Sequence, residues 1–140
     1  MKKFRSLLML ALVVMIFASV SVMSVAATKI NTGEVTIQGG YLHHWYPSSE
    51  GNTSNGWTVT KGGVQKCYIQ VGQTGYSMEI GLFYRPTGAT YMDFFEGSNT
   101  SKTINKSFTS DLDTALYRPC IQNNSTVSMT VLSSSYFTLV

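Results

Sequence analysis

The segment GGYLHHWYP, residues 39–47, holds both histidines of the chain beside three aromatic rings. Histidine is a common metal ligand, but a zinc site takes at least three protein ligands, and no acid or cysteine lies close to these histidines in the sequence. His43 and His44 are also adjacent, and adjacent residues of a strand point to opposite faces of a sheet. We therefore predict neither a metal nor a cofactor at this segment.

The aromatic rings of the same segment favour binding over catalysis. Sugar rings stack on aromatic faces through their C–H groups, while neighbouring polar side chains bind the hydroxyl groups. The opposing interpretation is that the segment packs where a strand enters the polar loop 47–56, with Trp57 in the core beside Val59. Both interpretations stay open, and the residues hypothesised to bind a ligand are Tyr41, His43, His44, Trp45 and Tyr46.

Residues 1–27 have the pattern of a bacterial secretory signal peptide. The basic residues Lys2, Lys3 and Arg5 precede the apolar run 7–18, and the small residues at 24–27 offer cleavage sites. The alternative is an uncleaved membrane anchor, because the uncharged run reaches the length of a marginal span. Cleavage would leave a secreted, extracellular protein with no membrane span in its mature form.

The net charge of the chain comes from the predicted signal peptide. The formal charge is +3, whereas the chain after residue 27 has seven Lys or Arg residues and seven Asp or Glu residues. A nearly neutral domain lacks the basic surface that binds nucleic acid or anionic lipid. We therefore exclude both as expected partners.

An extracellular location predicts a disulfide between Cys67 and Cys120, the two cysteines of the chain. Closing a loop of about 54 residues would stabilise the domain by about 4 kcal/mol in the chain-entropy model. Strand alternation complicates this prediction, since Cys67 shares a face with Ile69 whereas Cys120 shares the side of Arg118. A bulge near Pro119 would bring Cys120 back to the buried side.

The residue types that catalyse hydrolysis are present, but their pattern does not define an active site. A nucleophilic cysteine would have to be free and of low pKa, which a disulfide precludes. The carboxylate pairs at 93/96 and 111/113 each lie close along the chain, and that spacing says nothing about the separation across a cleft that a glycosidase requires. We predict no catalytic residues and no enzymatic activity.

Short alternating or apolar runs separated by Gly, Asn, Ser and Pro follow one another from residue 33 to the end. Such spacing predicts eight or nine short strands and no long helix. The expected fold is an all-β single domain at 28–140, an antiparallel β-sandwich of about eight strands, jelly-roll or immunoglobulin-like, after an N-terminal signal helix.

The segment DTALYRPC, residues 113–120, resembles the D-T-A-x-Y-x-C signature of immunoglobulin variable domains. It departs from that signature by an extra residue between Tyr117 and Cys120, and no tryptophan follows Cys67. We interpret the match as a consequence of sandwich physics, not of membership in that family. It predicts that Tyr117 is a structural corner residue.

Residues 80–140 resemble the small secreted β-sandwich modules of Gram-positive bacteria, and they are similar in pattern to the pre-peptidase C-terminal type of domain. The shared positions are Gly81, Leu82, Tyr117, Ile121, Asn123 and Ser125. Modules of this kind are generally non-catalytic. The resemblance therefore implies a β-sandwich fold more than a particular function.

These observations together predict a secreted, non-catalytic module that binds a cell-wall, glycan or surface ligand. The alternative from another class is a small secreted toxin or antimicrobial protein, against which the lack of a cationic amphipathic segment counts. A secreted hydrolase is the third and weakest alternative.

Overall fold

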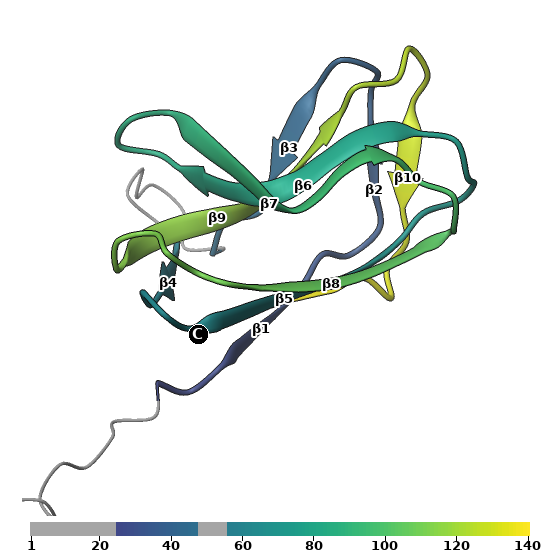
Figure 1. Ribbon diagram of the computed structural model, residues 1–140. Coiled ribbons are helices and arrows are strands. Elements are labelled where there is room, and N and C mark those ends of the chain that lie inside the picture. The colour runs from purple at the N-terminus through teal and green to yellow at the C-terminus, as the bar shows by residue number, and fades with distance from the viewer. Residues whose placement is uncertain (1–24, 48–55) are drawn as a thin grey trace, which may run out of the picture.

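The computed structural model describes residues 25–47 and 56–140, and within these ranges it contains strands and no helix (Figure 1). The predicted signal helix at 1–24 lies outside the described residues. All strand pairs are antiparallel, so the predicted all-β antiparallel fold is confirmed. The strands are β1 Thr28–Asn31, β2 Val35–Ile37, β3 Leu42–His44, β4 Trp57–Val59, β5 Val64–Gln70, β6 Ser77–Tyr84, β7 Ala89–Ser98, β8 Thr103–Thr109, β9 Ala115–Asn123, β10 Met129–Val131 and β11 Tyr136–Leu139.

The strand count is eleven in the described residues, so the prediction of about eight was too low. The additional strands include β1 and β3, which have four and three residues. Alternation is not visible in so few residues. These segments become strands because they pair with a longer or buried neighbour, β1 with β11 and β3 with β9.

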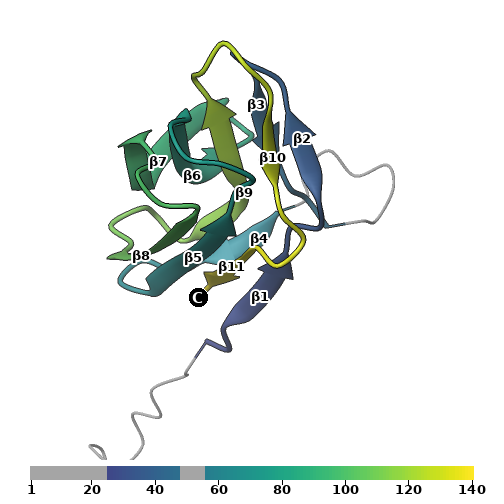
Figure 2. The same ribbon diagram turned by 90° about the vertical axis from the view of Figure 1, so that its right-hand side faces the viewer.

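The strands form two main sheets that lie in separate layers (Figure 2). The β5 sheet has the order β1-β11-β5-β8, and the β9 sheet has the order β3-β9-β6-β7, with β4 also paired to β9. A short third sheet pairs β10 with β2. Since β3 and β4 both pair with β9, at residues 120–122 and 115–117, the predicted binding segment starts at the edge of the β9 sheet.

One hydrophobic core is built from the inner faces of both main sheets. Phe137 of β11 is fully buried, and its ring centroid lies 5.6 Å from that of Trp45 and 5.7 Å from that of Phe94. Each of these rings comes from a different part of the chain, so the contact joins β11 to β7 and to the segment after β3. Other fully buried side chains are Ile69, Met78, Ile80, Leu82, Ile121, Met129 and Leu139.

A buried amide fixes the connection between β9 and β10. The Asn123 side chain donates to the carbonyls of Ile37 and Val127 at 2.9 and 2.8 Å, and its oxygen accepts from the Ser125 N–H at 3.0 Å. Burying an amide without partners is costly, and here its polar atoms are satisfied by backbone groups. Asn123 thereby holds β2 against the turn that follows β9.

Tyr117 is a corner residue, as its sequence context predicts. Its hydroxyl donates to the carbonyl of Asp113, four residues earlier, at 3.0 Å. The ring is buried. The bond closes the turn that leads into β9.

The predicted disulfide is absent: Cys67 and Cys120 are both buried as free thiols. Cys67 belongs to the hydrophobic core, beside Phe137 in the strand register. Cys120 pairs with His44 and shares the outward side of β9 with Arg118. Cys67 therefore points into the core between the two sheets, whereas Cys120 points to the opposite, outer face of the β9 sheet. The reason is that β9 keeps its alternation through Pro119, and no bulge there reverses it.

Both thiols should be unreactive in the folded protein. Burial raises the pKa of Cys67 to about 12 and that of Cys120 to about 12, and the thiolate is the reactive form. We expect a thiol reagent at mildly alkaline pH to label neither cysteine of the native protein, and to label both after unfolding in guanidinium without reductant. An unfolded, unreduced protein that takes up no reagent would show that the disulfide exists after all.

Candidate ligand-binding surfaces

The five residues predicted to bind a ligand do not form one platform. Trp45 is 9% exposed, and its indole N–H donates to the Thr32 carbonyl at 2.8 Å. His43 packs against it edge-on, with ring centroids 4.7 Å apart. Trp45 belongs to the core, and His43 is half-buried beside it. Tyr41 precedes β3 and is 62% exposed.

His44 and Tyr46 lie on the outward side of the β9 sheet, and we call them, with Phe83 and Arg118, the Tyr46 cluster. The His44 ring stacks on Phe83 with centroids 5.0 Å apart and an interplanar angle of 3°, and it lies 6.2 Å from Tyr46. The guanidinium of Arg118 lies 5.3 Å from the centre of the Tyr46 ring. Tyr46 itself is 61% exposed.

Burial and the neighbouring Arg118 together keep His44 of the Tyr46 cluster uncharged. Nη1 of Arg118 lies 3.2 Å from Nε2 of His44, and because a guanidinium only donates, the histidine nitrogen is the acceptor. Burial, followed by Arg118, His43 and Arg85, lowers the pKa of His44. His44 is therefore neutral at physiological pH, and Tyr46 is the part of the cluster that a ligand can reach.

A second aromatic surface covers the outer face of the β5 sheet, where strand register places four residues in one row. The pairs Asn31↔Tyr136, Tyr136↔Tyr68 and Tyr68↔Asn105 run across β1, β11, β5 and β8. The two tyrosine rings stack with centroids 5.3 Å apart and an interplanar angle of 18°. An asparagine therefore lies beyond each ring of a central tyrosine pair.

The next row on the same face is Lys29, Thr138, Lys66 and Ser107. The ammonium of Lys29 lies 4.0 Å from the centre of the Tyr136 ring, which is a cation–π contact. We call the two rows together the tyrosine face. Its eight residues include two lysines and no acid, so this surface is basic although the domain as a whole is nearly neutral.

Sequence reasoning missed the tyrosine face, although alternation alone contains part of it. Tyr68 lies between Cys67 and Ile69, and both of these are buried, so Tyr68 must point outward. Tyr136 precedes buried Phe137 in the same way. The contact between them depends on the pairing of β11 with β5, which no local pattern reveals.

Within the described residues, no group of three or more His, Cys, Asp and Glu side chains is arranged to hold a metal ion. The same part of the chain has no helix long and apolar enough to cross a membrane.

A scan of the chain against models of known protein families gives no match, and a comparison with curated proteins gives none either. The resemblance to pre-peptidase C-terminal-like modules therefore stays a prediction.

Proposed function

We propose that this protein is a secreted, non-catalytic β-sandwich module that binds a glycan of the cell wall or cell surface, and that the tyrosine face makes the contact. The observation that carries the proposal is the stacked pair Tyr68 and Tyr136 in one row with Asn31 and Asn105. Aromatic rings offer the apolar surface that sugar C–H groups prefer. The flanking amides can both donate to and accept from sugar hydroxyls.

The shape and charge of the tyrosine face favour an extended, acidic polymer over a small neutral sugar. The two rows span four adjacent strands, so several sugar units can lie along them. Lys29 and Lys66 add positive charge with no acid in either row. Attraction between exposed charges weakens with salt, so the affinity should fall as the ionic strength rises.

The proposal is tested by calorimetric titration of the purified protein with an acidic polysaccharide, such as polygalacturonate, and with neutral dextran. We expect saturable binding of the acidic polymer. Replacement of Tyr68 by alanine should weaken it about tenfold, because losing a stacked ring costs up to about 1.5 kcal/mol. The double variant Lys29→Gln, Lys66→Gln should remove most of its dependence on salt.

Tyr46→Ala is the matched control, because it removes an exposed tyrosine from the outer face of the other sheet. It should bind like the wild-type protein. If Tyr46→Ala loses binding and Tyr68→Ala keeps it, the ligand binds at the Tyr46 cluster. The assignment of the binding site to the tyrosine face is then wrong. If neither polysaccharide binds, the proposed function is wrong.

A further inference from the structure

A cavity of about 300 Å³ opens where the β6–β7 hairpin meets the segment that leads into β9. Three tyrosines from three different strands line it, one each from β6, β7 and β9. Two aspartates and a leucine from the segment before β9 complete most of the wall. The lining residues are Tyr84, Tyr91, Tyr117, Asp111, Asp113 and Leu112.

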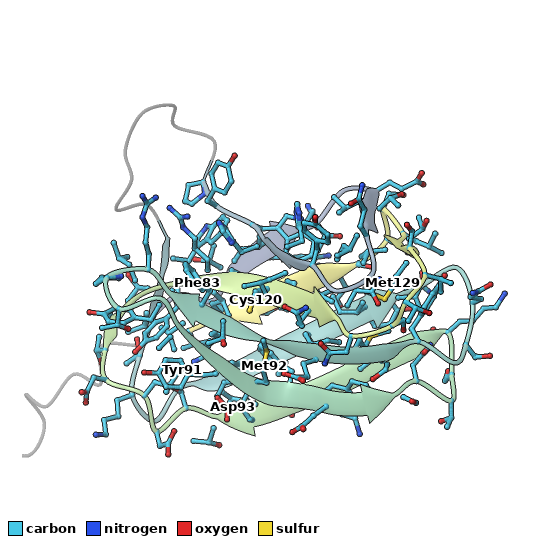
Figure 3. All side chains as sticks on the ribbon, turned by 90° about the horizontal axis from the view of Figure 1, so that it is seen from above. Phe83, Tyr91, Met92, Asp93, Cys120 and Met129 are labelled. Atoms are coloured by element: carbon cyan, nitrogen blue, oxygen red, sulfur yellow. The ribbon has the colours of Figure 1, made fainter. Side chains whose placement is uncertain are left out.

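The three rings of this cavity contact one another around Tyr117. The centroid of the Tyr117 ring lies 5.2 Å from that of Tyr84 and 6.1 Å from that of Tyr91, the second pair in an edge-on arrangement. The hydroxyl of Tyr117 is bound to the Asp113 carbonyl, so this ring cannot rotate away without losing that bond. Figure 3 labels Tyr91 and Asp93 on β7, the strand that supplies one wall of the cavity.

Negative charge is concentrated at the same place. Asp111 and Asp113 line the cavity, and Asp93 is close enough for the charge of Asp111 to raise its pKa, in addition to the larger effect of burial. Lys61 lies 3.4 Å from Asp113, and both side chains are largely exposed. A single exposed ion pair is weak, so Asp111 and Asp113 keep the cavity lining negatively charged.

We propose that this cavity, which we call the tyrosine cavity, binds a quaternary ammonium head group. A weakly hydrated cation is attracted to the faces of aromatic rings, and nearby carboxylates add a longer-range attraction. A cluster of tyrosines with acids at its mouth provides both, whereas an anion or a neutral sugar would meet repulsion or no charge complement. The inference is independent of the tyrosine face, which lies on the outer surface of the other sheet.

The test uses choline and 3,3-dimethyl-1-butanol, a neutral alcohol of nearly the same shape in which carbon replaces the charged nitrogen. We expect choline to titrate the purified protein saturably in calorimetry, and the neutral alcohol to bind at least about tenfold more weakly because it lacks the cation–π attraction. Equal binding of the two compounds would show that the cavity binds apolar groups without regard to charge, and it would overturn the proposal. No binding of choline would overturn it as well.

Variants place the binding in this cavity. Asp111→Asn removes one carboxylate at an exposed position, and Tyr91→Leu removes one ring. Each of these two substitutions should weaken choline binding several-fold. Tyr91→Phe keeps the ring and should bind choline like the wild type. Glu79→Gln is the charge-matched control on β6 outside the cavity. If Asp111→Asn, Tyr91→Leu and Glu79→Gln all bind choline like the wild type, the site lies elsewhere and the inference is wrong. Polysaccharide titration of the same variants tells the two proposals apart, since none of these substitutions touches the tyrosine face.

Discussion

Replacing Gly81 by alanine should destabilise the protein by more than about 3 kcal/mol, the upper range for a group forced into a packed site. A Cβ atom at this position would lie 2.0 Å from the carbonyl oxygen of Tyr91 and 2.7 Å from the Cα of Met92. Both are backbone atoms of the neighbouring strand, so no side-chain rotation can relieve the clash. β7 would have to move away from β6.

The close approach at Gly81 comes from an irregularity in strand pairing. Ile80 pairs with Phe95 and Leu82 pairs with Tyr91, so three residues of β7 lie opposite the single residue Gly81. This bulge turns Phe94 into the core while Tyr91 still reaches the tyrosine cavity. The clash would therefore disturb both the core and the cavity.

The midpoint of urea unfolding, followed by fluorescence, measures the effect of Gly81→Ala. Gly72→Ala is the matched control, because a Cβ at Gly72 meets nothing within 4 Å and its backbone does not require glycine. We expect the control to unfold like the wild type. A Gly81→Ala protein that unfolds at the wild-type urea concentration would mean that β6 and β7 pair differently from the arrangement described above.

Replacing Phe137 by alanine is the second substitution with a large expected effect. Phe137 is fully buried, and it contacts Trp45 and Phe94. Truncating a buried phenylalanine costs about 3–5 kcal/mol, because the transfer free energy is lost and a cavity remains. Phe94 lies in β7 and Trp45 in the segment after β3, so the surrounding structure has little freedom to collapse into the space.

Tyr136→Ala provides the comparison for Phe137→Ala, because the neighbouring ring points to the outer face of the same strand. Its loss should cost no more than about 1.5 kcal/mol, the contribution of a stacked aromatic pair. Urea unfolding of the two variants measures the difference. Equal losses of stability would show that Phe137 does not point into the core while Tyr136 points to the outer face of β11.

The alternation of residues predicted much of this fold, because a strand has a period of two that any short segment reveals. It correctly separated His43 from His44, and it placed Cys67 inside and Cys120 on the side of Arg118. The error was the added bulge at Pro119, which was invoked to allow a disulfide. Alternation on its own correctly predicts that Cys67 and Cys120 lie on faces that do not meet.

The extent of the binding surfaces could not be predicted in this way, because each depends on residues far apart in the chain. Trp45 looked like part of an exposed platform, yet it turns inward to the Thr32 carbonyl and the Phe137 ring. Tyr68 and Tyr136 become neighbours only through the register of β5 with β11.

Local sequence thus assigns each strand residue to one of two faces, since the direction of a side chain depends on its own backbone. It does not specify which side chain from another strand lies beside it, because that depends on strand order, register and bulges across the whole domain. The face of Tyr136 follows from its neighbour Phe137, whereas its partner Tyr68 follows from the sheet. The meeting of Tyr84, Tyr91 and Tyr117 around one cavity is likewise a result of tertiary packing.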